Sequence, residues 1–196
     1  MNSKREVFSY NTSESQIIIN PNWFIGFLEG EGTFGIKTGS SLYFQIAQKN
    51  TNQESLNAIT IFLTGLSNDD LKNSKILPMN VVSTVNTRTN VVSLVVSSVD
   101  SLYYYFLPLL DSSEMYTRKA VDFRLWRLAL LLKIHGYYYL PEGKKLFLDI
   151  SDILNKRYST DSNGNSDEII FIIFERSKSI LEKDPPFYVK SNKPHV

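Results

Sequence analysis

The sequence predicts an α+β fold in which helices cover one side of an antiparallel sheet, and three observations support it. Residues 24–31 form an apolar run with two glycines four residues apart, as in a closely packed helix. Two pairs of short segments with alternating apolar and polar residues then indicate two β-hairpins. The second half of the chain carries apolar residues at helical spacing.

The first predicted helix ends in acidic residues. Gly26 and Gly30 lie one turn apart on one face, so another backbone can approach closely there. Glu31 falls at the end of the helix, and Gly32 is suited to stop it. A tight seam between two such helices would bring two carboxylates together, and paired carboxylates can hold Mg²⁺ against phosphate oxygens.

The following segments predict the order of the elements. Residues 33–37 and 42–49 form the first hairpin, and a helix over about 54–64 follows, for which Asn50 and Thr51 offer caps. A second hairpin joins residues 80–87 to 91–97. A helix then runs from Asp100 or Ser101 towards Pro108, which gives the order αββαββα.

Three further helices are expected in the rest of the chain. Residues 118–135 form a largely apolar helix with Trp126 on its flank, and Gly136 ends it. Pro141 and Glu142 start the next helix. After a polar linker over 161–166, a helix over 167–183 turns inward the apolar residues Ile169, Ile170, Ile173, Phe174, Ile180 and Leu181. The tail from Asp184 is expected to be extended and docked, or disordered.

Residues 24–32, Phe-Ile-Gly-Phe-Leu-Glu-Gly-Glu-Gly, resemble the signature of the LAGLIDADG homing endonucleases position for position. The likeness extends to residues 44–49 and 119–126 and covers about 22–157. It implies the LAGLIDADG fold, with a saddle-shaped antiparallel sheet and additional C-terminal helices. We therefore expect an N-terminal extension or linker over 1–20, a LAGLIDADG domain over 21–160, and a helical extension and tail over 161–196.

The resemblance also implies functional roles. Glu31 would be catalytic and would ligate Mg²⁺ with help from the Gly30 carbonyl, since Mg²⁺ prefers oxygen ligands. Gln48 matches a glutamine that orders water, and Lys119, or its neighbour Arg118, matches a basic residue that steadies phosphate charge. For Glu29 we expect a structural hydrogen-bonding role near the helix end.

In this family the concave face of the sheet lies in the DNA major groove. Lys37, Tyr43 and Gln45 alternate away from the apolar residues of the first hairpin, so they are candidates for that face. The other candidates for nucleic-acid binding are Lys49, Asn86, Arg88 and Ser93. The alternative for all of them is a merely solvated sheet face, which would show the same alternation.

One motif supplies half of an active site, so the sequence predicts either a homodimer joined at Gly26 and Gly30 or a partner repeat elsewhere. The function predicted is a Mg²⁺-dependent, site-specific double-strand endonuclease acting on DNA. The alternative is a catalytically idle RNA-binding relative, either an intron maturase or a structural subunit of an organellar ribonucleoprotein. A net charge of +1 favours the alternative, because strong nucleic-acid binders usually carry a basic excess.

Composition excludes several classes. The chain has no cysteine, so it has neither disulfides nor a thiolate metal site. No apolar run approaches the ~18–20 residues of a membrane span. Only four alanines occur beside abundant Asn, Ser, Tyr, Phe, Ile and Leu, as AT-rich coding produces, which points to a mitochondrial gene.

Overall fold

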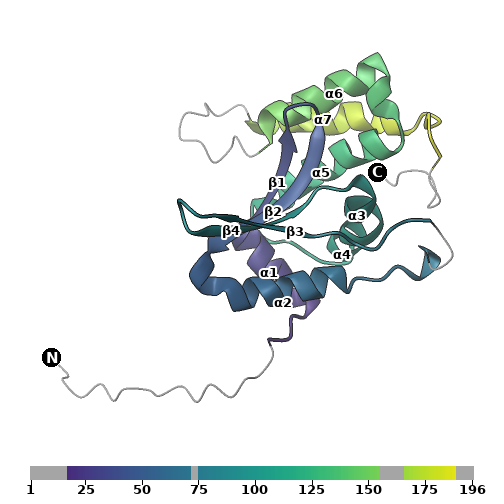
Figure 1. Ribbon diagram of the computed structural model, residues 1–196. Coiled ribbons are helices and arrows are strands. Elements are labelled where there is room, and N and C mark those ends of the chain that lie inside the picture. The colour runs from purple at the N-terminus through teal and green to yellow at the C-terminus, as the bar shows by residue number, and fades with distance from the viewer. Residues whose placement is uncertain (1–16, 72–74, 155–165, 189–196) are drawn as a thin grey trace, which may run out of the picture.

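The computed structural model describes residues 17–71, 75–154 and 166–188. The predicted αββαββα order is confirmed in the first part of the chain (Figure 1). Its elements are α1 (Pro21–Glu31), β1 (Gly32–Lys37), β2 (Ser41–Lys49), α2 (Gln53–Thr64), β3 (Val82–Asn86), β4 (Val91–Val96), α3 (Val99–Ser101) and α4 (Leu107–Asp111). The helices α5 (Lys119–Ile134), α6 (Pro141–Ile153) and α7 (Ser166–Leu181) follow.

The four strands form one antiparallel sheet in the order β1-β2-β4-β3. The two hairpins therefore meet along β2 and β4, where Phe44 pairs with Val96 and Lys49 pairs with Val91. Alternate residues of β2 and β4 are buried, which places one face of the sheet against the helices and leaves the other open. β3 is an edge strand, and all five of its residues are exposed.

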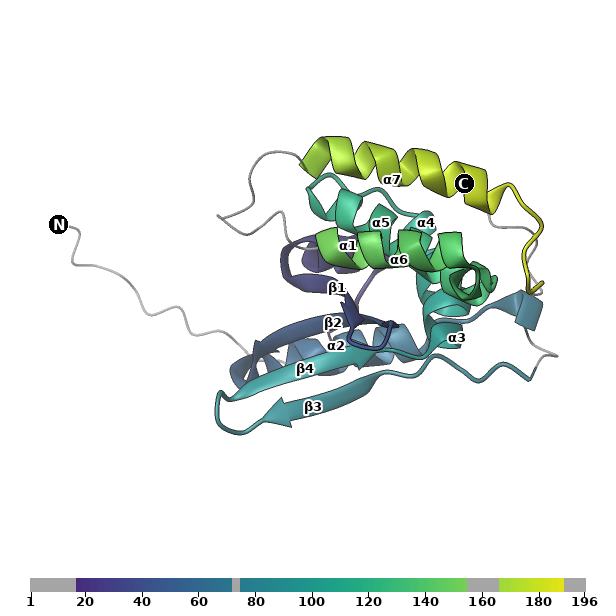
Figure 2. The same ribbon diagram turned by 90° about the horizontal axis from the view of Figure 1, so that it is seen from above.

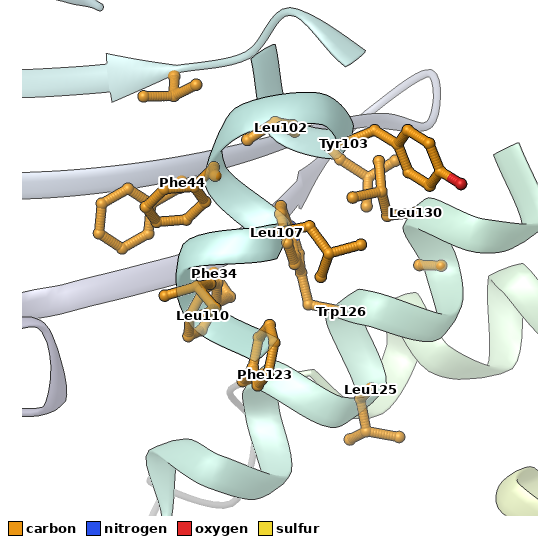
Figure 3. Packing of buried hydrophobic residues seen from close by; sticks show 14 of the residues in the cluster. Phe34, Phe44, Leu102, Tyr103, Leu107, Leu110, Phe123, Leu125, Trp126 and Leu130 are labelled. Carbon is orange, nitrogen blue, oxygen red and sulfur yellow. The ribbon is translucent and has the colours of Figure 1, made fainter. Parts of the chain in front are cut away.

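Aromatic rings fill the space between the sheet and the helices (Figure 3). Phe34 of β1 lies 5.5 Å from Phe44 of β2 and 5.2 Å from Trp126 of α5, measured between ring centroids. Trp126, which was expected to extend the apolar surface of the helix, is completely buried. The helix packs against the sheet on one side and α6 on the other, which covers its whole middle turn.

The expected caps of α2 are also wrong. Residues Asn50–Asn52 form a separate 3₁₀ turn, and Asn52 precedes α2 without a side-chain cap. The helical segment that follows the second hairpin begins after Ser98, whose hydroxyl accepts from the Ser101 N–H. It passes through a π-helical turn at Leu102–Phe106 and continues to Asp111, beyond the expected end near Pro108.

The chemistry of proline explains why this helix does not stop. Pro108 has no N–H to give to the carbonyl four residues earlier, so a helix interior normally loses a hydrogen bond there. In this chain Asn68 Nδ2 donates to that Tyr104 carbonyl at 2.9 Å. The π-helical turn just before the proline provides the local change in winding.

The C-terminal helices stack beyond α5, with α7 outermost (Figure 2). α5 ends at Gly136, whose φ of 82° is the left-handed conformation that a glycine adopts readily. Of the α7 residues expected to face inward, Ile170, Ile173, Ile180 and Leu181 are buried and Phe174 is half-buried, but Ile169 is 42% exposed and was wrongly assigned. The expected linker over 161–166 lies almost wholly outside the described residues, so the division into domains stays a prediction.

The start of the tail is docked. The Tyr137 hydroxyl donates to the Lys183 carbonyl at 2.6 Å, and the Phe187 N–H donates to the His135 carbonyl at 2.9 Å. The Phe187 ring lies over Gly136, where a Cβ atom would come within 2.5 Å of it. These contacts hold residues 183–187 against the corner between α5 and α6. The part of the tail after Tyr188 lies outside the described residues.

Candidate functional site

The candidate site is built at the carboxyl end of α1. Asn20 caps the start of this helix by accepting from the Trp23 N–H at 2.8 Å, and Pro21 occupies its first turn. The Gly32 N–H closes the other end by donating to the Leu28 carbonyl. A Cβ atom at Gly32 would lie 2.6 Å from that carbonyl oxygen, so only glycine fits. β1 starts at once, and Glu31 stays exposed at the junction.

The helix dipole disfavours a carboxylate at this end, and α1 has no basic residue in its last turn. The positive charge comes instead from α5. Lys119, the first residue of α5, donates from Nζ to the Gly32 carbonyl at 2.6 Å. The structure therefore brings Lys119 and Glu31 to the same helix end, from positions 88 residues apart in the sequence.

Glu29 makes the hydrogen bonds expected of it near the end of the helix. Its Oε1 accepts from the backbone N–H groups of Tyr116 and Thr117, both at 2.7 Å. These two residues belong to the loop that leads into α5. Beside them the Tyr116 hydroxyl donates to Glu114 at 2.6 Å, and this bond raises the pKa of the Tyr116 phenol.

Gln48 lies at the same end of the sheet. Gly32 of β1 pairs with Ile46, so Gln48 is two residues beyond the first rung of the β1–β2 ladder. Two residues of a strand span about 6.8 Å. The Gln48 side chain is half-buried, and its Oε1 accepts from Asn52 Nδ2 at 3.1 Å. Glu31 is the last residue of α1, Lys119 the first of α5, and Gln48 lies near the end of β2, so all three are at the ends of elements. Their catalytic roles stay predictions.

The open face of the sheet contains the other candidates of the first hairpin. The strand register places Lys37, Tyr43, Gln45, Lys49 and Ser93 on this face together. Lys37 Nζ lies 5.3 Å from the centre of the Tyr43 ring, and Gln45 Nε2 donates to Ser93 Oγ at 3.2 Å. The face is thus partly ordered by its own contacts, and each of these residues keeps accessible surface.

The charge of this face differs from that of the chain. Its strand residues are Thr33, Gly35, Lys37, Ser41, Tyr43, Gln45, Ala47, Lys49, Val82, Thr84, Asn86, Val91, Ser93 and Val95. They include two lysines and no carboxylate. The weak net charge of the whole chain therefore does not describe the surface that would meet a nucleic acid.

The two candidate residues at the β3–β4 turn, Asn86 and Arg88, differ in their contacts. Asn86 Oδ1 accepts from the N–H groups of Arg88 and Thr89, at 3.1 and 3.2 Å, so this side chain shapes the turn. Arg88 is exposed at the tip. Sequence reasoning missed Thr33 and Thr84, which share the open face and hydrogen-bonding chemistry. The signal that could have found them is the register of the two hairpins.

Gly26 and Gly30 lie on an exposed face of α1. A Cβ atom built on either of them meets nothing within 4 Å, so the described chain leaves room beside both. Trp23 and Phe27 stack against each other on this helix, with 5.1 Å between ring centroids. Trp23 is 42% exposed, which is unusual for so large an apolar side chain.

The residues at the foot of α1 provide only oxygen donors. Glu31 supplies a carboxylate, and the Gly30 carbonyl is one of those at the helix end that no N–H within the helix can reach. This donor set fits Mg²⁺. Among the described residues, no three His, Asp or Glu side chains gather into a group that could hold a metal ion. One copy of this helix end therefore provides half of a carboxylate pair.

No helix in the described part of the chain has the length and apolar character needed to cross a membrane.

Comparison with known proteins identifies the family. A sequence model for the family described as LAGLIDADG endonuclease matches residues 24–130. The chain is 29% identical over 157 residues to an uncharacterized mitochondrial protein, RF1, of Saccharomyces cerevisiae. That match covers 74% of this chain, and the chain spans only 33% of the yeast protein.

Solved structures share the fold. A homing endonuclease, I-TnaI, superposes with a TM-score of 0.55 at 21% identity, over 82% of this chain and 99% of that one. The LAGLIDADG homing endonuclease I-GzeII, solved in complex with its DNA target, gives a TM-score of 0.57 at 20% identity, over 80% of this chain and 49% of that one. The matched family segment covers more than half of the 196 residues and includes Glu31, Gln48 and Lys119. The chain therefore belongs to the LAGLIDADG endonuclease family.

Proposed function

We propose that this protein is a site-specific endonuclease that cuts double-stranded DNA by metal-dependent phosphodiester hydrolysis. The single observation that carries the proposal is the meeting of Glu31 and Lys119 at the carboxyl end of α1, where the Lys119 ammonium donates to the Gly32 carbonyl at 2.6 Å. An exposed carboxylate and an ammonium at the same helix end suit a phosphate that must be held and hydrolysed.

Glu31 and the Gly30 carbonyl would hold Mg²⁺, which when bound would polarise the scissile phosphate and lower the pKa of a water molecule. Lys119 places its Nζ at this point and can donate to a phosphate oxygen. Gln48 offers an amide at the same end of the sheet and can orient a water molecule by hydrogen bonding. These roles divide metal binding, charge stabilisation and water positioning among three elements.

The open face of the sheet would read the DNA. It carries amide, hydroxyl and ammonium groups without a carboxylate, so it can donate to base edges and to phosphate alike. Gln45 and Lys37 suit adenine and guanine respectively. Arg88, at the tip of the second hairpin, would contact a phosphate of the DNA backbone or the edge of a base. Because the relative I-GzeII was solved in complex with its DNA target, we favour DNA as the partner.

The active centre would be completed by a second LAGLIDADG repeat packed on the Gly26–Gly30 face of α1, in a homodimer or within a longer polypeptide. The space beside both glycines supports such packing. The relatives fit both arrangements, because the chain spans 99% of I-TnaI but 49% of I-GzeII. We further propose that the protein works in mitochondria, where its yeast relative is placed by name.

The test is cleavage of a plasmid library with randomised inserts. We expect linear product in Mg²⁺ and binding without cleavage in Ca²⁺, with the cut inserts sharing one long, partly palindromic sequence. A parallel selection on a randomised structured-RNA pool shows which nucleic acid is preferred. Retention of RNA with no cut DNA in Mg²⁺ would overturn the proposal in favour of the RNA-binding alternative.

A further inference from the structure

We propose that Glu29 is a positioning residue that fixes Lys119 at the catalytic centre. This inference rests on the proposed nuclease function. Glu29 lies two residues before Glu31, on the last turn of α1. It reaches the loop before α5 and accepts two backbone N–H groups there, from Tyr116 and Thr117, both at 2.7 Å.

Thr117 in turn is hydrogen-bonded to Lys119. The Thr117 hydroxyl accepts from the Lys119 N–H at 3.2 Å, and its carbonyl accepts from the Ala120 N–H at 3.1 Å. Thr117, which Glu29 holds, is therefore also hydrogen-bonded to the first two residues of α5. Its backbone N–H bonds α1, and its two oxygens bond α5.

The Lys119 side chain then returns to α1. Its ammonium donates to the Gly32 carbonyl at 2.6 Å, one residue after Glu31. Glu29, Thr117, Lys119 and Gly32 thus form a closed ring of contacts between the last turn of α1 and the first turn of α5. A ring of this kind fixes both the position of the α5 backbone and the direction of the lysine side chain.

The two carboxylates of the motif therefore have different tasks. Glu31 is exposed and available to a metal ion, whereas Glu29 is half-buried and occupied by the loop. A carboxylate accepting two N–H groups makes charge-assisted bonds, which are stronger than those of a neutral acceptor. They join the loop before α5 directly to the last turn of α1.

The experiment compares variants of the full-length protein on the DNA target found by library cleavage. Glu29→Ala removes the acceptor, and Glu29→Gln keeps an oxygen of the same shape without its charge. Supporting residues around a site typically matter by about 10- to 100-fold. We expect Glu29→Ala to lower the single-turnover cleavage rate by that factor, with a smaller loss for Glu29→Gln and little change in binding in Ca²⁺.

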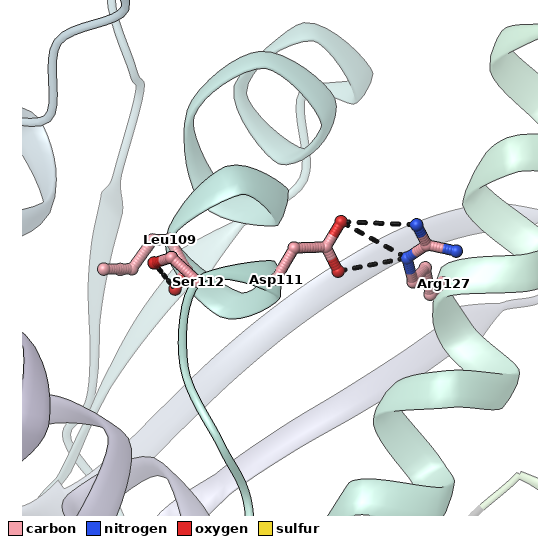
Figure 4. A network of polar contacts seen from close by, with 4 residues as sticks. All are labelled: Leu109, Asp111, Ser112 and Arg127. Atoms are coloured by element: carbon pink, nitrogen blue, oxygen red, sulfur yellow. Dashed lines mark hydrogen bonds and ion pairs between the residues drawn. The ribbon is translucent and has the colours of Figure 1, made fainter. Parts of the chain in front are cut away.

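A double-mutant cycle separates positioning from stability. If Glu29 acts through Lys119, Glu29→Ala in a Lys119→Ala background will slow cleavage no further, to within about twofold. Asp111→Asn is the matched control. Asp111 ties the end of α4 to Arg127 of α5 across the same loop, with 3.0 Å between Oδ1 and Nε, but does not touch Lys119 (Figure 4). We expect it to leave the cleavage rate unchanged.

The reactivity of Lys119 towards acetic anhydride, measured by mass spectrometry, needs no nuclease activity. Its bond to Gly32 should slow acetylation, and Glu29→Ala should speed it several-fold while Asp111→Asn does not. If wild type cuts no DNA but the acetylation pattern holds, the nuclease function fails and the positioning stands. If wild type cuts DNA and neither rate responds to Glu29→Ala or Glu29→Gln, the positioning role is overturned.

Discussion

At the scale of single residues, the foot of α1 shows how a helix end can hold charges that its own dipole disfavours. Glu29 is occupied by two backbone N–H groups, and Lys119 supplies an ammonium to the Gly32 carbonyl. Glu31 remains exposed between them. Because the helix dipole disfavours a carboxylate at this end, the position of Glu31 agrees with the metal-binding role proposed for it.

Glu31→Gln tests the metal-binding role directly. The substitution keeps the shape of an exposed side chain, so the free energy of unfolding should change by less than about 0.5 kcal/mol. Cleavage of the target plasmid in Mg²⁺ should be abolished. Binding in Ca²⁺ should be retained or slightly strengthened, because one negative charge next to the phosphates is gone. Robust cutting by this variant would contradict the assignment of Glu31.

His135 offers a pH test of stability. Its ring is 1% exposed, and within the described residues neither ring nitrogen has a hydrogen-bond partner, so burial lowers the pKa of His135 below its ordinary value of 6.5. The unfolded chain then binds a proton more readily than the folded one. Stability should be full above pH 6.5 and should fall as the pH drops through the unfolded pKa towards the folded one.

His135→Phe should remove this part of the pH dependence, because phenylalanine has no proton to bind. Urea unfolding between pH 5 and pH 8 measures it. The control is His195→Gln, since His195 is the only other histidine of the chain. An unchanged pH profile in His135→Phe would show that the ring is not the group that titrates.

How much of the site could be predicted differs from residue to residue. Glu31 and Glu29 lie in one contiguous motif whose chemistry is readable from the sequence. The partners of Glu29 could not be foreseen, because they are backbone N–H groups 87 and 88 residues away, and backbone groups leave no signal in residue type. Lys119 was found through resemblance, and its contact with the Gly32 carbonyl needed the fold.

At the scale of elements, the tip of the first hairpin is tied to the end of α5. Ser40 has a φ of 73°, a conformation that costs a residue other than glycine free energy. Its hydroxyl accepts from Lys133 Nζ at 2.7 Å, and the same ammonium lies 3.9 Å from the centre of the Tyr138 ring. A hydrogen bond from the Ser40 side chain lowers the pKa of Tyr138.

Lys133→Met should loosen this tip. Methionine keeps the apolar stem between the hairpin and the rings of Tyr138 and Phe147, but it cannot donate to Ser40. The loss of a half-buried charged hydrogen bond should cost about 1–3 kcal/mol. Urea unfolding measures the cost, and hydrogen exchange should show faster opening at residues 37–41. Lys145→Met on the exposed side of α6 is the control, and equal exchange in the two variants would contradict the tie.

The same scale shows where sequence patterns work and where they fail. Alternation located all four strands to within two residues, because one buried and one open face leave a period of two. The helix after the second hairpin was predicted, but its continuation past Pro108 to Asp111 was not. Its continuation depends on Asn68, which is 36 residues from the carbonyl that it satisfies, so a local pattern cannot contain it.

At the scale of the whole molecule, the Gly26–Gly30 face of α1 is an exposed face with room beside it. The described chain puts no atom within 4 Å of a Cβ atom at either glycine, while the stacked rings of Trp23 and Phe27 lie on the same helix. An apolar helix face with room for a second backbone fits the packing of two repeats. It also makes the pairing separable from the folding of one repeat.

Gly26→Leu tests this separation. Inside one repeat the leucine has space and favours the helix. The free energy of unfolding of the single chain should therefore be unchanged or raised by up to about 1 kcal/mol. Between two repeats it should overpack the seam by about 1–3 kcal/mol. Sedimentation should therefore show a dimer for wild type and for Ser179→Leu, a control on α7, and a monomer for Gly26→Leu. A monomer in all three proteins would rule out homodimerisation.

The exposure of β3 has a consequence for how the protein can change its target. All five of its side chains are accessible, and all but that of Asn86, which holds the turn, should tolerate substitution with a change in stability below about 0.5 kcal/mol. On β2, by contrast, every second position is buried and fixed by the core. New base preferences can therefore accumulate along β3 without a penalty in folding. Lineages and engineered libraries that retarget this protein should diverge first at Val82 and Thr84, on its open side.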